Sequence, residues 1–169
     1  MDTTALITQM QTHAESIRNL AQDISDEQAH WKPDPESWSI LEVLCHLYDE
    51  ECRDFRVRLD IILHHPDEPW PPIDPKGWVT SHLYSQRDLS QTVANFLDER
   101  QKSLAWLKGL ESPDWQASCK TPWGSMTAGD MFASWVAHDL LHLRQLVELN
   151  YAYTAQAVQP HAVMYAGEW

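Results

Sequence analysis

Two histidines four residues apart are the feature of this sequence with the clearest chemical meaning. His138 and His142 lie in a run whose apolar residues recur every three or four positions, which predicts a helix. Residues four apart lie one turn above each other on the same face, so both imidazoles can reach one metal ion. The alternative is that each ring hydrogen-bonds to a neighbouring helix, because a buried imidazole needs a partner.

A third donor is expected from another helix. His46 follows a predicted helix start at Ser39 by seven residues, about two turns, and borders an apolar stripe. Glu50, one turn further, could be a fourth ligand, a general base or an acceptor that orients His46. The plainer alternative for Glu50 is a solvated carboxylate paired with Arg53.

Three histidine donors would leave an open coordination position. Such a site suits Zn²⁺, Ni²⁺ or Fe²⁺. It could activate a water for hydrolysis or a thiol for transfer, and the ligands alone do not choose between these reactions.

The elements that must hold these residues are predicted to be helices. Apolar stripes indicate four long helices, at 3–24, 39–63, about 85–110 and 127–150, with a short turn at 27–31. Ser39 with Glu42, and Thr127 with Asp130, have the spacing of capping boxes. We therefore predict an all-α four-helix bundle, and periodicity leaves the order of its helices open.

Three segments lie outside these stripes. Residues 66–81 contain five prolines together with Trp70 and Trp78, and residues 111–125 form a second predicted loop. The aromatic tail, 151–169, is expected to pack back on the bundle. The proline-rich loop and the tail could line the mouth of the site or a dimer contact.

Composition narrows the classes of protein that remain. The 169 residues fit one domain, 1–169, and the formal net charge of −13 argues against nucleic acids and anionic membranes. No apolar run approaches the roughly 18 residues of a membrane span, and no signal-peptide pattern is evident. The three scattered cysteines, Cys45, Cys52 and Cys119, favour a reduced, cytoplasmic location.

Several short strings together resemble the DinB-like (DinB/YfiT) family of metal-binding four-helix bundles, over nearly the whole chain. The strings are Trp31-x-Pro33, Trp38-Ser39-Ile40-x-Glu42-Val43-x-x-His46-Leu47, Pro122-Trp123-Gly124 and His138-Asp139-x-x-His142-Leu143-x-Gln145-Leu146.

The resemblance implies more than the spacing does. It implies helices in up-down-down-up order with longer crossover loops, a divalent metal, commonly nickel or zinc, on His46, His138 and His142, and frequent homodimers. It also implies a small-molecule substrate and either a metal-dependent hydrolase or a transferase using a low-molecular-weight thiol. The alternatives are a metal- or ligand-binding stress-response protein without turnover, and a plain bundle whose histidines are hydrogen-bonded core residues.

Overall fold

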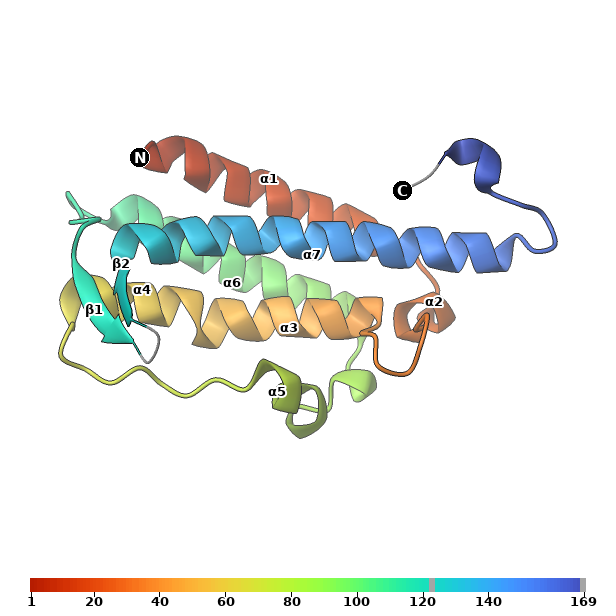
Figure 1. The fold of residues 1–169 in the computed structure, drawn as a ribbon, viewed down its shortest axis with the longest axis horizontal. Helices are drawn as coiled ribbons and strands as arrows, with labels where there is room; N and C mark the ends of the chain where they lie inside the picture. Colours follow the sequence, from red (N-terminus) through yellow and green to blue (C-terminus); the bar gives the residue numbers. More distant parts are fainter. Residues whose placement is uncertain (122–123, 168–169) are drawn as a thin grey trace.

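Four long helical segments form the bundle in the computed structural model, which describes residues 1–121 and 124–167 (Figure 1). The predicted all-α bundle is confirmed. The segments are α1 (Thr3–Ala21), α3 (Ile40–Arg53) continued by α4 (Phe55–His64), α6 (Leu89–Gly109) and α7 (Ala128–Ala157).

The order of the helices is up-down-down-up, as the family resemblance implied. In Figure 1, α1 and α7 run in one direction while α3–α4 and α6 run in the other. Helix α1 packs against α6 and α7, and α3 packs against α6. The short α2 (Asp26–His30) joins α1 to α3, and a long crossover joins α4 to α6.

Both helices that carry the candidate histidines begin with the predicted capping box. The Ser39 hydroxyl accepts from the backbone N–H of Glu42 at 3.2 Å, and Glu42 accepts from the backbone N–H of Ser39 at 2.9 Å. Thr127 and Asp130 make the same reciprocal pair at the start of α7. These caps pair otherwise unsatisfied N–H groups, so they define where each helix begins.

The predicted single helix over 39–63 is wrong in one respect. Asp54, with φ −118° and ψ −89°, interrupts it and divides α3 from α4. Two backbone hydrogen bonds still span this residue, from Asp54 to Glu50 (3.1 Å) and from Arg58 to Asp54 (2.8 Å). One non-helical residue leaves the apolar spacing almost unchanged, so periodicity does not reveal the break.

The two predicted loops contain regular structure. Residues 111–125 include β1 (Ser118–Thr121), which pairs antiparallel with β2 (Gly124–Thr127), Cys119 opposite Met126. The crossover contains α5 (Pro75–Ser81) and the 3₁₀ turn Tyr84–Gln86. Elements this short give too little periodicity to be recognised from sequence. Pro122 and Trp123, part of one family string, lie outside the described residues.

The last helix and the tail also differ from expectation. Helix α7 continues past Asn150 to Ala157, and the Asn150 amide donates to the Leu20 carbonyl at 3.1 Å, linking α7 to α1. The expectation that the tail packs on the bundle is wrong for Met164 and Tyr165, which are largely or fully exposed, whereas Tyr153 packs edge-on against Trp31 with ring centroids 5.6 Å apart. Glu168 and Trp169 lie outside the described residues.

The described core has two large apolar clusters with polar residues between them, and a small third cluster made of Leu41, Cys45 and Tyr84. One large cluster contains Met10, Leu59 and Trp135, and the other contains Ile17 and Phe96. At the level between the two large clusters, all four long helices place polar side chains. We call this set the polar layer; it comprises His13, His46, Glu50, Glu51, Arg100, His138, Asp139 and His142.

No helix among the described residues combines the length and apolar character needed to cross a membrane.

Candidate metal centre

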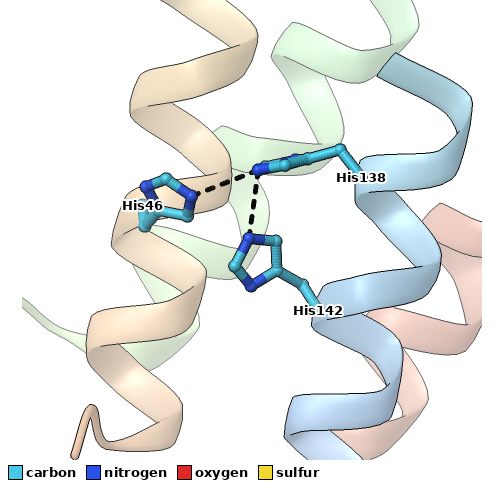
Figure 2. Close-up of side chains that lie close together, drawn as sticks. All are labelled: His46, His138 and His142. Atoms are coloured by element: carbon cyan, nitrogen blue, oxygen red, sulfur yellow. Dashed lines mark hydrogen bonds between the residues drawn. The ribbon is translucent and has the colours of Figure 1, made fainter. Parts of the chain in front are cut away.

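Three histidines of the polar layer converge between α3 and α7 (Figure 2). The Nε2 atom of His138 lies 3.4 Å from Nε2 of His46 and 3.1 Å from Nε2 of His142. One ring nitrogen from each residue lies within 4.8 Å of the other two. The structure thus brings together the three residues singled out from the sequence, which we call the histidine triad.

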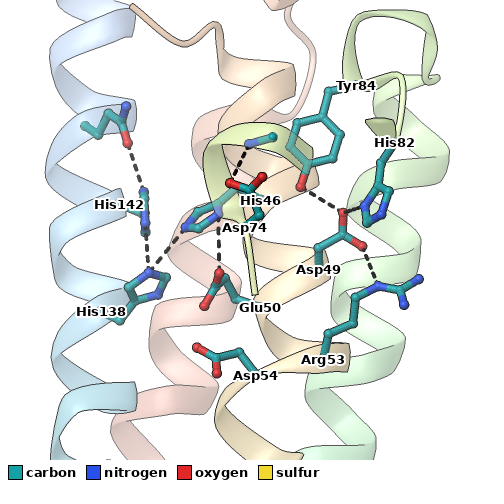
Figure 3. Close-up of polar contacts among 12 residues, drawn as sticks. His46, Asp49, Glu50, Arg53, Asp54, Asp74, His82, Tyr84, His138 and His142 are labelled. Atoms are coloured by element: carbon teal, nitrogen blue, oxygen red, sulfur yellow. Dashed lines mark hydrogen bonds and ion pairs between the residues drawn. The ribbon is translucent and has the colours of Figure 1, made fainter. Parts of the chain in front are cut away.

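The outer nitrogens of two triad rings face oxygen atoms (Figure 3). The Nδ1 atom of His142 lies 2.9 Å from the side-chain oxygen of Gln145. Because a carboxamide oxygen only accepts, this contact places the proton of His142 on Nδ1 and the lone pair on Nε2. The Nδ1 atom of His46 lies 3.8 Å from Oε1 of Glu50, and both atoms are buried without a described hydrogen-bond partner.

Burial keeps the triad uncharged. Burial, and then the neighbouring rings of His142 and His138, lower the pKa of His46 to about 2. Burial followed by His142 lowers the pKa of His138 to about 3, and burial also lowers that of His142. The rings are therefore neutral at pH 7, the form in which histidine binds metal ions.

The triad fits a divalent ion. Nitrogen ligands in a tetrahedral site lie about 2.0–2.1 Å from zinc, and so about 3.3 Å from one another. The two Nε2 separations in the triad, 3.1 and 3.4 Å, bracket this value. Neutral rings whose lone pairs face one another repel, and a cation between them satisfies all three.

Aromatic side chains border the triad. The ring centroid of Trp38 lies 4.9 Å from that of His46, and the Phe55 centroid lies 4.9 Å from that of His138. These apolar neighbours limit the movement of the imidazoles and keep bulk water away from two of them.

Glu50 is buried, so the expectation of a solvated carboxylate is wrong. It is 4% exposed, and Arg53, its expected partner, instead lies 3.3 Å from Asp49. Burial, and then the nearby Asp54 carboxyl, raise the pKa of Glu50. Arg58 pairs with Asp54 at 2.7 Å. Glu50, Asp54 and Arg58 follow one another at four-residue intervals, a spacing in the sequence that indicates contacts along one helix face.

A cavity of about 590 Å³ opens beside the triad. It lies between the segment that precedes α3 and the second half of α7. The residues that line it are Pro33, Glu36, Ser37, Trp38, His142, Gln145, Glu148, Leu149 and Ala152. A small molecule in this cavity would contact one ring of the triad, a feature that spacing alone did not predict.

The other polar groups near the triad are paired within the chain. Asp139 binds Arg100 of the neighbouring helix α6. Arg100 was missed, although its place between Phe96 and Leu104 on an apolar stripe was a usable signal. On another face of α3, Asp49 accepts from Nδ1 of His82 at 2.7 Å and from the Tyr84 hydroxyl at 2.8 Å (Figure 3).

Comparison with known proteins agrees with this architecture. Residues 9–146 match the family model of the DinB superfamily. The fold resembles that of YfiT from Bacillus subtilis, a probable metal-dependent hydrolase with an unusual four-helix bundle topology, with a TM-score of 0.80 and 18% identity over 90% of this chain and 87% of that one. No curated protein sequence matches. Since the family model covers most of the chain, including all three residues of the triad, this protein is a member of the DinB superfamily.

Proposed function

We propose that this protein is a metal-dependent hydrolase of a small molecule, with a divalent ion held by His46, His138 and His142. The observation that carries the proposal is the convergence of three neutral imidazoles, His46 buried and His138 and His142 half-buried, beside a cavity of about 590 Å³. The similarity to YfiT, itself described as a probable metal-dependent hydrolase, supports the same reaction class.

The triad and Gln145 have different roles in such a site. A divalent ion supplies Lewis acidity and lowers the pKa of a water that it binds. The triad holds three positions around the ion and leaves a further position open, as catalytic sites require. Gln145 keeps the Nδ1 proton of His142 in place, so that Nε2 stays available as a ligand.

Glu50 acts on His46 in this proposal. Its carboxyl group lies 3.8 Å from Nδ1 of His46, on the side of the ring away from His138. A carboxyl oxygen in that place can accept a hydrogen bond from Nδ1–H when the two atoms approach each other, which would fix the orientation of the ring. We therefore assign Glu50 as a positioning residue, in preference to a fourth ligand or a general base.

The cavity sets limits on the substrate. Pro33, Trp38, Leu149 and Ala152 give it apolar walls, and its two charged lining residues, Glu36 and Glu148, are acidic. Apolar walls with few polar groups are typical of small-molecule sites. Because none of the described residues that line this cavity is a lysine or an arginine, an anionic thiol finds no cationic side chain there, and we favour hydrolysis over thiol transfer.

Metal analysis and activity assays test the proposal. The chain, purified without chelator, should contain close to one equivalent of zinc, nickel or iron. It should hydrolyse members of a panel of small esters and amides, and a chelator should abolish this activity. His138→Ala should lose the metal and the activity, while His161→Ala, at an exposed position of the tail, should keep both.

Two results would decide against this function. A metal-loaded protein that hydrolyses nothing in the panel, with or without added thiols, would favour a metal- or ligand-binding protein without turnover. A chain that binds no divalent ion would leave the histidines as hydrogen-bonded core residues.

Oligomeric state and location remain predictions. Leu140 and Leu141 of α7 are 52% and 64% exposed, which supports a homodimer through this helix. Light scattering of Leu141→Lys against the parent chain tests it. Three cysteines without a disulfide support a cytoplasmic location, which fractionation of the source cells would test.

A further inference from the structure

A single guanidinium joins all four long helices at the level of the polar layer. Arg100 of α6 is 1% exposed; its Nε and Nη2 donate to Glu51 of α3, each at 2.9 Å. Its Nη1 and Nη2 donate to Asp139 of α7 at 2.6 and 2.8 Å. Nη1 also donates to the Met10 carbonyl of α1 at 3.2 Å, and Trp135 Nε1 donates to Glu51 at 3.1 Å.

We call Arg100, Glu51, Asp139 and Trp135 the Arg100 clamp. It adjoins the histidine triad on both helices that supply metal donors. Asp139 directly follows His138, and Glu51 comes five residues after His46. Successive residues of an α-helix point about 100° apart, so Asp139 points about 100° away from His138 on α7, and Glu51 points about 140° away from His46 on α3.

Stability alone does not account for this clamp. Removing three charged side chains from water is costly, and well-packed apolar residues of similar volume are often equally stable or more so. The charged side chains instead fix the relative orientation of the helices that carry them. A guanidinium presents its N–H groups in a rigid planar fork, so each carboxylate binds it at a defined angle. Four such bonds to α3 and α7 restrict the separation and rotation of these helices.

The clamp also carries charge. Two carboxylates face one guanidinium, which leaves a formal charge of −1, and His13 Nδ1 lies 3.4 Å from Asp139. Asp139 is covalently next to His138. A negative charge in that place favours a cation among the triad rings.

We propose that Arg100 is a positioning residue for the metal centre. It holds α3 and α7 so that Nε2 of His46 meets Nε2 of His138 and His142. Its described hydrogen bonds go to Glu51, Asp139 and Met10 and none goes to a ring of the triad, so it positions the triad through the helices that these residues belong to. The proposal rests on the metal-dependent function above, because it concerns how the same site holds its ion.

Titration of the full chain with Co²⁺ tests the proposal. The dissociation constant measures affinity, and the absorption spectrum reports coordination geometry. One variant combines Arg100→Met, Glu51→Gln and Asp139→Leu, which removes the buried charges and leaves an acceptor for Trp135. A second is Asp139→Asn alone. The control is Glu99→Gln, which alters an ion pair of α6 with Arg56 (2.8 Å) outside the clamp.

Both clamp variants should keep the helical circular dichroism of the parent chain but bind Co²⁺ about 10-fold or more weakly, the loss typical when the supports of metal ligands are removed. Their Co²⁺ spectra should shift, and the control should match the parent.

Parental affinity and spectrum in a folded clamp variant would overturn the proposal. Where the triple variant does not fold, Asp139→Asn decides by the same criteria. Failure of both to fold would make the clamp a requirement for folding only, and would overturn the proposal too. A parent chain that binds no Co²⁺ would instead contradict the proposed function.

Discussion

The histidine triad and the Arg100 clamp lie at the same level of the bundle, yet they satisfy their polar groups differently. The clamp side chains of α3, α6 and α7 are buried, whereas in the triad His46 of α3 is buried and His138 and His142 of α7 are half-buried. In the clamp, each carboxylate meets N–H groups of Arg100 at 2.6–2.9 Å. In the triad, ring nitrogens face one another at 3.1 and 3.4 Å, and Nδ1 of His46 has no described hydrogen-bond partner.

This difference separates a structural polar cluster from a binding site. Buried polar groups must be paired, so the chain supplies the partners itself wherever only structure is needed. The Asp49 cluster follows the same rule, since His82 and Tyr84 both bind its carboxylate. Within the described part of the chain, the triad is the one group of three donors placed to hold a metal ion from outside the chain.

Removing one triad nitrogen should have the largest effect on metal binding and little effect on the fold. We expect His138→Ala to weaken binding by more than the 10–100-fold typical of residues that only support ligands. Its circular dichroism should match the parent, because the lost ring has no buried charge partner. Isothermal titration with Zn²⁺ measures the effect. Equal affinities for His138→Ala and the parent chain would show that the metal binds elsewhere.

Replacing Arg100, the centre of the clamp, should reduce the stability of the fold much more than replacing His138 does. Arg100→Ala leaves Glu51 and Asp139 buried without a counter-charge, and breaking a buried pair in this way costs about 3–5 kcal/mol. Urea unfolding of the metal-free variant measures the loss. If Arg100→Ala and His138→Ala lost the same free energy of unfolding, the clamp and the triad would not differ in stability as their contacts indicate.

The sequence predicted the half of the polar layer that follows helical spacing. His138 and His142 share a face by their four-residue interval, and the capping box at Ser39 places His46 on its helix. Its pairing with His138 depends on the relative positions of two helices, which spacing within either one does not determine. Spacing made His46 the best candidate for the third donor, and the family resemblance implied the same three residues.

The other half was missed because its partners are distant in sequence. Arg100 meets residues 49 positions before and 39 positions after it, and nothing local identifies them. The β-hairpin and α5 were missed for another reason: elements of four to seven residues have too few positions to show a period.

Acid should destabilise the metal-free protein through the triad. The pKa of His46 falls to about 2 and that of His138 to about 3 on folding, from an unfolded value near 6.5. Between these values the unfolded chain binds more protons than the folded chain. The contribution of these two rings to the free energy of unfolding is therefore complete above pH 6.5. It is lost as the pH falls below 6.5, at a rate that approaches about 1.4 kcal/mol per pH unit for each ring.

Urea unfolding in chelator between pH 8 and pH 5 measures this dependence. His46→Leu should flatten the slope, because leucine does not titrate, while the Arg100 clamp is unchanged. A slope identical to that of the parent would show that His46 does not stay neutral on folding, and would remove the electrostatic contrast between the triad and the clamp.

Glu50→Gln should have the smallest effect, and it separates positioning from ligation. A glutamine in this place keeps an oxygen near Nδ1 of His46, which lies 3.8 Å from the carboxyl group of Glu50. Glutamine cannot ionise, whereas Glu50, whose pKa burial raises, can ionise when a cation binds beside it. We expect Zn²⁺ affinity to fall by about 10-fold, as for other partners of ligating histidines, and Glu15→Gln, at an exposed position of α1, to have no effect. Loss on the scale of His138→Ala would instead make Glu50 a ligand, and the triad a site of four protein donors without an open position.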